Sequence, residues 1–286
     1  MSGDAGRWRF AFSKRWLGYL ALLIVFAIAC GFLSRWQFDR REEKVAENHR
    51  IEANFDRAAV PIDEVLPELG SWDTEIEWMP VELHGRYLAD QQLLARARPF
   101  NGFPGFEILT PFETDSGRIF IVNRGWVPTG NEQDAPDHVP APPAGEVTVT
   151  ARLKPGEPEI PGRSAPAGQI ATIHLPTFAQ QLGEDRVYQG AYGLLATEDP
   201  AADHGDLVPR PQLTEGNHLS YAVQWIIFAV IAAAGLVLGI RNEYRYRNPD
   251  DPKVQAAKAR EAARKARRAK TDGEIEDAIL DELESR

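Results

Sequence analysis

Leu219–Ile240 reads LSYAVQWIIFAVIAAAGLVLGI, a run of 22 residues without a charged side chain. As a helix this run extends about 33 Å, which matches a hydrocarbon core of about 30 Å. Tyr221 and Trp225 lie near its start, and Tyr244 and Tyr246 follow its end. This placement is typical of aromatic residues at the two surfaces of a membrane. The run therefore predicts a membrane span rather than the buried helix of a soluble protein.

A second uncharged run, Leu17–Leu33, lies near the N-terminus and holds 17 residues, which is the lower limit for a span. Four basic residues precede it, and Ala27-Ile28-Ala29 fits the small-x-small pattern at which signal peptides are cleaved. Cleavage there would leave Cys30 as the first residue, so a lipid-modified cysteine is a further alternative. Because the apolar run continues through Leu33, an uncleaved anchor is favoured.

The net charge of −10 is unevenly distributed along the chain. Residues 1–16 carry +3, residues 34–218 carry −14 and residues 241–286 carry +1. Eleven basic residues lie in 241–270, whereas Arg210 is the only one in 198–218. Because basic residues mark the cytoplasmic side of a span, the C-terminal tail is predicted to be cytoplasmic. An acidic central domain also argues against a nucleic-acid partner, which would require a basic face.

These observations predict a multi-pass protein of a bacterial plasma membrane, with two spans and both termini in the cytoplasm. Sixteen residues before the first span leave little room for an organellar transit peptide. The predicted order is a cytoplasmic N-terminus (1–16), a first span (17–33), an extracytoplasmic domain (34–218), a second span (219–240) and a cytoplasmic charged tail (241–286).

The outer domain is predicted to be mainly β with one or two helices, which makes the whole chain an α+β membrane protein. Alternating apolar residues and one continuously apolar stretch indicate the strands. The candidate strands are Val81–Tyr87, Leu93–Arg98, Phe106–Pro111, Ile119–Asn123, Val147–Leu153, Gln169–His174 and Val187–Leu194. Arg35–Arg57 is predicted to continue the first span as a solvated helix, and Pro176–Leu182 to form a short one.

The charged tail has two blocks. Lys253–Lys270 is rich in Ala, Lys and Arg and predicts a basic helix, whereas Thr271–Arg286 is acidic. The basic block is expected to lie against anionic lipid headgroups. A docking segment for a cytoplasmic partner is the alternative.

Most forms of active-site chemistry are excluded by residue counts and spacing. A single Cys and two Met rule out a disulfide framework, a four-thiolate metal site and a soft-ligand copper carrier. None of the six His is followed by another three or four residues later, so no helical zinc motif exists. There is also no nucleophile elbow and no phosphate-binding glycine loop. We therefore expect no enzyme activity and no copper or zinc site.

His218 is the one candidate ligand that its position singles out. It precedes the second span, and Tyr221, Trp225 and small residues follow it at helical spacing; the small residues are Ala229, Ala232 and Gly235 or Gly239. Small residues on one helix face allow a second helix to approach closely. A neutral imidazole beside aromatic rings could bind a flat porphyrin through its iron. The simpler interpretation is that Asn217 and His218 hydrate the start of the helix.

Two further motifs carry charge at defined places. In Asn123-Arg124-Gly125-Trp126, Gly125 is expected to hold a backbone angle that other residues resist. Arg124 either forms an internal ion pair or binds a haem propionate or a partner's carboxylate. Trp36-Gln37-x-x-Arg40 lies where the first span ends, and either anchors the chain at the membrane surface or contacts a partner.

Six sequence motifs in this order resemble those of the Surfeit locus protein 1 family of cytochrome c oxidase assembly factors. The resemblance covers roughly residues 17–245. Its motifs are Trp36-Gln37-x-x-Arg40, Pro80-Val81-x-Leu83-x-Gly85-x-Tyr87, Arg98-Pro99, Gly102-x-Pro104-Gly105-Phe106-x-Ile108-Leu109-Thr110-Pro111, Val122-Asn123-Arg124-Gly125-Trp126-Val127-Pro128 and Asn217-His218-Leu219-Ser220-Tyr221-Ala222-x-Gln224-Trp225. One departure is that Ser34-Arg35 precede Trp36, where the family pattern has a glycine.

The resemblance implies two membrane helices around an outer domain and a role in building the haem-a-containing subunit I of the oxidase. It also implies that His218 matches a histidine thought to hold haem a in some bacterial members, with Tyr221 and Trp225 beside it. The expected partners are subunit I, haem a synthase and the lipid bilayer. The alternatives are a cofactor-free accessory protein that binds oxidase subunits, and a tethered outer domain unrelated to oxidase.

Overall fold

The structure is a computed structural model that describes residues 7–131 and 134–266. The chain divides into two compact units, one formed by Met1–Arg41 with Gly216–Arg286 and the other by Glu42–Glu215. Each unit is described by itself.

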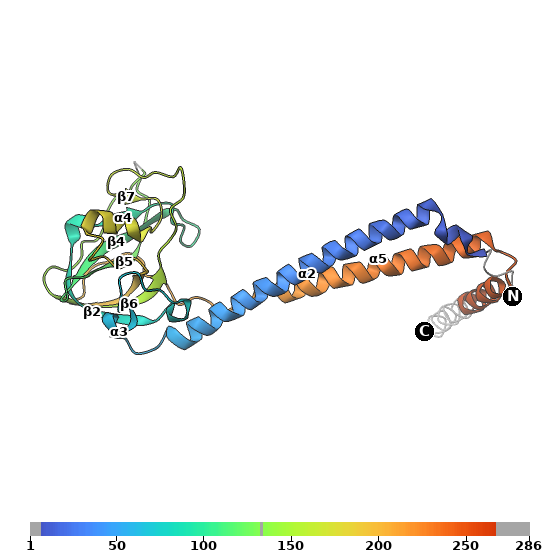
Figure 1. Cartoon of the computed structure of the whole chain (residues 1–286), viewed down its shortest axis with the longest axis horizontal. Helices are drawn as coiled ribbons and strands as arrows, with labels where there is room; N and C mark the ends of the chain where they lie inside the picture. Colours follow the sequence, from blue (N-terminus) through green and yellow to red (C-terminus); the bar gives the residue numbers. More distant parts are fainter. Residues whose placement is uncertain (1–6, 132–133, 267–286) are drawn as a thin grey trace, which may run out of the picture. The chain divides into compact units, whose positions relative to one another are not determined.

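The first unit is a pair of long antiparallel helices (Figure 1). These are α2 (Lys14–Asn54), of which residues 14–41 belong to this unit, and α5 (His218–Arg247). A short turn of helix, η1 (Arg9–Phe12), precedes α2, and residues 252–266 form a further helix after α5. Both long helices are long and apolar enough to cross a membrane. In their most apolar windows only 11% of α2 and none of α5 is buried within the chain, so these side chains need cover from lipid or from another protein.

The two helices meet along a seam with small or polar residues at its centre. On α2 the buried or partly buried positions include Trp16, Leu23, Cys30 and Gln37, each seven residues from the last. On α5 they alternate at spacings of four and three residues, and they are His218, Ala222, Trp225, Ala229, Ala232, Leu236 and Gly239. This 4–3 spacing is the pattern of helices that pack at a shallow angle.

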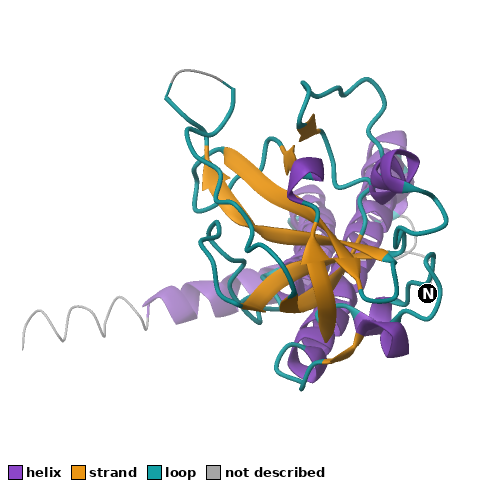
Figure 2. Ribbon diagram, turned by 90° about the vertical axis from the view of Figure 1, so that its left-hand side faces the viewer, coloured by secondary structure: helices purple, strands orange, loops and turns teal. Residues whose placement is uncertain are grey.

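The second unit contains a β-barrel, as Figure 2 shows. Five strands pair in a ring, in the order β2–β6–β8–β5–β4, and β4 pairs back to β2 to close it. Their bounds are β2 (Pro80–Tyr87), β4 (Gly105–Thr114), β5 (Ile119–Pro128), β6 (Val147–Pro155) and β8 (Ala191–Asp199). The smaller elements are β1 (Val60–Pro61), α3 (Ile62–Val65), η2 (Thr74–Ile76), η3 (Ala89–Gln91), β3 (Leu93–Ala95), β7 (Gln169–Ile170) and α4 (Leu175–Leu182).

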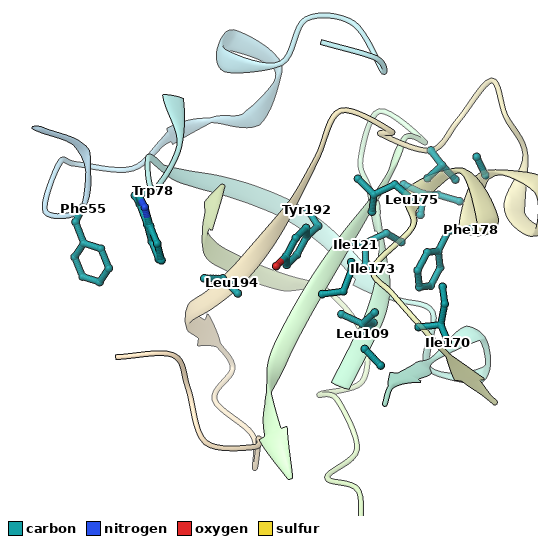
Figure 3. Packing of buried hydrophobic residues seen from close by; sticks show 14 of the residues in the cluster. Phe55, Trp78, Leu109, Ile121, Ile170, Ile173, Leu175, Phe178, Tyr192 and Leu194 are labelled. Carbon is teal, nitrogen blue, oxygen red and sulfur yellow. The ribbon is translucent and has the colours of Figure 1, made fainter. Parts of the chain in front are cut away.

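The core has two large clusters, because β5 is buried on both faces, and a third, small one around Phe106, Ile108 and Val127. Phe120 and Val122 point to one cluster together with the alternating residues of β2 and β6. Ile119 and Ile121 point to the other, which contains residues of α4 and the last turn of α2 (Figure 3). In this second cluster Leu175 and Phe178 come from α4, Ile51 comes from α2, and Phe55 and Trp78 follow from the adjoining loops. The continuously apolar stretch Ile119–Asn123 predicted a strand that is buried on both faces, and β5 confirms it.

The predicted strands occur with shifted ends. The candidate Val187–Leu194 begins at Ala191 instead, because the backbone N–H groups of Gln189 and Gly190 both donate to Leu69 rather than to a strand. Gln169–His174 shortens to two residues, since the chain turns at Thr172–His174 to enter α4. The predicted basic helix of the tail is present in residues 252–266, whereas the acidic block Thr271–Arg286 lies outside the described residues.

Candidate functional site

His218 is the first residue of α5, and two features position it. Gly216, with a φ of +64°, turns the chain just before the helix. A Cβ at this glycine would lie 3.3 Å from Cδ2 and 3.5 Å from Nε2 of the imidazole. The glycine therefore leaves room beside the Nε2 edge of a ring that is itself partly buried.

The other ring nitrogen of His218 is held by α2. Nδ1 lies 2.8 Å from Oε1 of Gln37. An amide oxygen only accepts hydrogen bonds, so Nδ1 carries the proton and donates it. In the neutral ring the lone pair is then on Nε2, which is the state in which histidine binds a metal. Metal-ligating histidines are generally oriented by such a bond from the far nitrogen, so Gln37 fixes both the tautomer and the orientation of a candidate iron ligand.

One turn further along, the helices are joined by Ser34. Its side chain is 5% exposed, and its Oγ donates to the carbonyl oxygen of Ala222 at 3.0 Å. Ser34 and Ala222 are small, so the backbones approach closely enough for this bond. Ser34, the first of the two residues that precede Trp36, thus places a small side chain at the helix contact.

The predicted face of α5 is corrected at one position, because Tyr221 is 48% exposed. His218, Trp225, Ala229 and Ala232 lie on the seam, and of the two alternative glycines Gly239 lies on it, whereas Gly235 is exposed. The seam advances by four residues from His218 to Ala222, not by three to Tyr221. The small-residue face is therefore not an open groove but the surface on which α2 packs.

The remaining predicted residues near this end lie apart from His218. Trp36 is 53% exposed and Arg40 is also exposed, both away from the seam. Trp225 is partly buried, with its ring edge-on to Phe228 at 5.8 Å. The residue that the structure brings to His218 directly is Gln37, which was predicted only as part of the motif at the end of the first span.

Arg124 lies on β5 in the barrel unit and is fully buried. Its Nη2 and Nε donate to Glu198 at 2.8 and 3.3 Å, and its remaining donors reach the carbonyl oxygens of Pro140 and Asp203. Tyr87 donates its hydroxyl to the same carboxylate at 2.9 Å. Burial and the charge of Glu198 raise the pKa of Tyr87, so its hydroxyl stays a donor. The structure has the internal ion pair, and the guanidinium is not accessible to a propionate or a partner.

Close backbone contacts explain the glycines of the barrel motifs. Gly125 has a φ of +102°, and a Cβ there would lie 2.6 Å from the backbone of Gly205. A Cβ at Gly85 would lie 2.0 Å from the carbonyl oxygen of Glu113. Gly105 lies under the indole of Trp126, which donates its N–H to the carbonyl of Arg98 at 2.7 Å, and the adjacent Pro104 is exposed. These motif residues hold strands and loops together.

A third polar cluster surrounds Arg98. The guanidinium forms two hydrogen bonds with Glu157, at 2.8 and 2.6 Å, and lies 3.7 Å from Glu107. Oε2 of Glu107 is buried without a hydrogen-bond partner among the described residues. Burial raises the pKa of Glu107 despite the nearby guanidinium. Glu157 has a lowered pKa, because hydrogen bonds from Arg98 and the Ile173 backbone outweigh its burial.

Comparison with known proteins identifies the family. A sequence profile described as the SURF1 family matches residues 24–230. The chain is also 32% identical over 246 residues to an uncharacterized SURF1-like protein of Mycobacterium tuberculosis, covering 80% of this chain and 85% of that one. The chain belongs to the SURF1 family.

More distant SURF1 relatives include eukaryotic proteins. Surfeit locus protein 1 of Xenopus tropicalis is 24% identical over 231 residues, covering 71% of this chain and 70% of that protein. The cytochrome oxidase assembly protein SHY1 of Saccharomyces cerevisiae is 26% identical over 144 residues, covering 48% of this chain and 36% of that protein.

Several contacts of this SURF1 chain escaped prediction. The role of Gln37 was missed, although the heptad spacing of Trp16, Leu23, Cys30 and Gln37 was visible in the sequence. Glu198 was missed because no local pattern distinguishes it among 42 acidic residues. Within residues 7–131 and 134–266, no group of three or more His, Cys, Asp or Glu side chains could hold a metal ion.

Proposed function

We propose that this chain assists the assembly of cytochrome c oxidase and that His218 receives haem a through Nε2. Membership of the SURF1 family and the name of the yeast relative support oxidase assembly. The hydrogen bond between His218 and Gln37 is the single observation that supports haem a as the cargo. A bound haem would supply an iron atom that an imidazole nitrogen can bind. The role is that of an assembly factor and not of an enzyme.

The proposed topology has two spans, both termini in the cytoplasm and the barrel outside a bacterial plasma membrane. The two exposed apolar helices and the basic residues after α5 support it. A phosphatase fused after Gly145 should be active, and one fused after Arg247 inactive. The opposite pattern would overturn the orientation.

The first span is proposed to stay uncleaved. The seam supports this, because Trp16 and Leu23 pack on α5 and both precede the possible cleavage site before Cys30. Intact-mass measurement of the purified protein should give a chain that retains both residues. A chain that begins at Cys30 would show that the first span is a signal peptide.

In the proposed site His218 would be the protein side chain that binds the haem iron. Gln37 keeps Nδ1 protonated, so Nε2 remains a ligand. Tyr221 and Trp225 act as secondary aromatic contacts, each adding about 0.5–1.5 kcal/mol. Arg124 has no part in this site, because its side chain is fully buried and each of its three nitrogens donates within the barrel. The proposed recipient is subunit I, and the proposed donor is haem a synthase.

The test is complementation of a strain that lacks the gene. Wild-type protein should restore oxidase haem a, and His218→Ala should not, although it is inserted at normal abundance. Tyr221→Ala should restore most of the oxidase haem a, since that ring adds a contact to the haem and does not bind its iron. Normal oxidase with His218→Ala would overturn the haem assignment.

A cofactor-free accessory role is the second candidate. It is favoured by the observation that α2 already covers the small-residue face of α5. In that case subunit I should co-purify with wild-type protein and with His218→Ala in equal amounts, and neither should carry a haem signal. If subunit I co-purifies with neither, both oxidase-related roles fail.

A further inference from the structure

The end of α5 that carries Arg245 and Arg247 is joined to the helix of residues 252–266 by a fixed turn. Asp251, which is 4% exposed, is its centre. Its carboxylate accepts hydrogen bonds from the hydroxyl of Tyr244 at 2.6 Å, from Arg7 at 2.8 Å and from the backbone N–H of Lys253 at 2.8 Å. Trp8 stacks on Tyr244 with ring centroids 4.2 Å apart. These contacts hold the second helix beside the end of α5.

A cleft lies between these two helices. Its volume is about 570 Å³, and its lining includes Arg245, Lys253, Arg260 and Arg264 with one carboxylate, Glu261. A smaller cavity of about 170 Å³ shares Arg245 and Lys253 with it and adds Arg241, Trp8 and Tyr244. We call the two together the basic cleft, defined by Arg241, Arg245, Lys253, Arg260 and Arg264.

The cations of the basic cleft differ from their neighbours in having no carboxylate partner among the described residues. Arg7 pairs with Asp251, and Arg15 and Arg247 both pair with Glu243. By contrast, none of the five cleft cations lies within 4.0 Å of a carboxylate in the part of the chain that is described. Five positive charges around these two adjoining cavities, with Glu261 as the one carboxylate in their lining, create a field that favours an anion.

The position of the cleft along α5 points to the source of the anion. The charge-free run ends at Ile240, and Arg245 lies five residues later, about 7.5 Å along a helix. The headgroup layer outside a hydrocarbon core of about 30 Å is about 5–7 Å thick. Stacked Trp8 and Tyr244 are the kind of residues found at this depth. With α5 spanning the membrane, the cleft thus opens at the level of the lipid phosphates. This inference rests on the proposed topology.

We propose that the basic cleft binds the phosphate headgroup of an anionic phospholipid from the cytoplasmic leaflet. Arginine matches phosphate oxygens with pairs of N–H donors, and lysine adds a point charge. A neutral zwitterionic lipid has the same phosphate but carries its own cation, which the five cleft cations repel. The bound lipid fixes the depth of α5 by joining its end to the leaflet.

The test is titration of lipid onto the purified full-length protein in a neutral detergent, followed by native mass spectrometry. The probes are phosphatidylglycerol, phosphatidylcholine and free glycerol phosphate. The double variant Arg245→Gln, Lys253→Gln removes two charges from the cleft. The matched control, Arg9→Gln, Lys14→Gln, removes two exposed charges at the same end of the hairpin outside the cleft.

Wild-type protein should retain phosphatidylglycerol in preference to phosphatidylcholine. The cleft variant should bind it about 30-fold more weakly, from about fivefold for each cation, and the control should change by less than about twofold. If the cleft variant does not fold, Arg260→Gln, Arg264→Gln replaces it, since both side chains are exposed.

Three results would overturn the proposal. These are equal loss in the control, equal binding of phosphatidylcholine, and displacement of the lipid by stoichiometric free glycerol phosphate, which would identify a soluble phosphate as the ligand. The measurement contains neither haem nor oxidase, so a failed haem assignment leaves it unaffected. A failed topology is detected separately by the phosphatase fusions.

Discussion

The ion pair of Arg124 in the barrel and the hydrogen bond of His218 in the helix pair are built for different tasks. The Arg124 side chain is 0% exposed, and every nitrogen donates to an oxygen of the same domain. His218 is only partly buried, its Nδ1 bonds to Gln37, and a side chain at Gly216 would reach within 3.5 Å of its Nε2. A closed network stabilises a fold, whereas an open nitrogen is available to a ligand.

Under the proposed function, this difference divides the motif residues of this chain into two groups. The barrel motifs around Gly85, Gly105, Gly125 and Arg124 are explained by packing and buried charge. The motifs on the helix pair, Gln37 and His218, meet although they are 181 positions apart. Substitutions in the barrel should therefore reduce the amount of folded protein, and substitutions at the helix pair should reduce binding by protein that is folded.

The largest effect is expected for Arg124→Met. Removing the guanidinium leaves Glu198 buried without its cation, which should lower the free energy of unfolding by about 3–5 kcal/mol. Denaturant unfolding followed by tryptophan fluorescence measures this. Arg86→Met is the matched control, because Arg86 is 62% exposed in its ion pair with Glu113 and should cost at most about 1 kcal/mol. Equal losses in the two variants would show that the buried ion pair contributes no more to stability than the exposed one.

A slightly smaller loss is expected for Gly125→Ala. The left-handed backbone angle and the contact with the Gly205 backbone together should cost about 3 kcal/mol. Gly117→Ala separates the two causes, because Gly117 has a φ of +77° with no atom within 4 Å of a Cβ. It should cost about 1 kcal/mol in the same unfolding experiment. An unchanged stability of Gly125→Ala would refute the close contact.

Gln37→Leu should act on binding and not on the barrel. Loss of the acceptor releases the imidazole of His218, and the affinity for haem a should fall by about 10-fold or more. Gln224→Leu is the control, since Gln224 is exposed on α5. Haem titration followed by absorption gives both affinities. If both variants bind as the wild type does, Gln37 does not position the ligand.

The smallest effect is expected for Glu107→Gln, and it has the opposite sign. Because the pKa of Glu107 is raised above 4.5, the folded barrel holds its proton more tightly than the unfolded chain. The contribution of Glu107 to the stability of the wild type is complete below pH 4.5 and is lost as pH rises through the raised pKa. The variant should thus be more stable at neutral pH, by about 1 kcal/mol, with the difference vanishing towards pH 4.5.

Glu113→Gln is the matched control for this pH dependence. Hydrogen bonds from Arg86 lower the pKa of Glu113 below 4.5. Its stabilisation is present above pH 4.5 and lost as pH falls through the lowered pKa. The variant should therefore be less stable than the wild type at neutral pH. Unfolding curves of both variants between pH 4 and 8 would contradict the account if their differences had the same sign.

The elements with strong periodicity were predictable from the sequence. The alternation of Val147, Val149, Ala151 and Leu153 marked a strand with one buried face, and the continuous run Ile119–Val122 marked one buried on both. The ends of strands were not, because they depend on distant hydrogen bonds such as those of Gln189 and Gly190 to Leu69.

The candidate site was also predictable only in part, because helical spacing describes one helix and not the partner that packs on it. Helical spacing found His218 and Trp225, which lie on one face of one helix. It placed Tyr221 on that face where the structure has Ala222, since the register of the seam depends on the partner helix. The choice for Arg124 between an internal and an external partner also needed the fold, because Glu198 lies 74 positions away.

The most direct test of the division between barrel and helix pair is the amount of haem a per molecule of purified protein. It is measured for His218→Ala and Gly125→Ala after co-expression with the enzymes of haem a synthesis. His218→Ala should be abundant and free of haem, whereas Gly125→Ala should be scarce but carry as much haem per molecule as the wild type. Wild-type haem content in His218→Ala, or haem-free but abundant Gly125→Ala protein, would contradict the account.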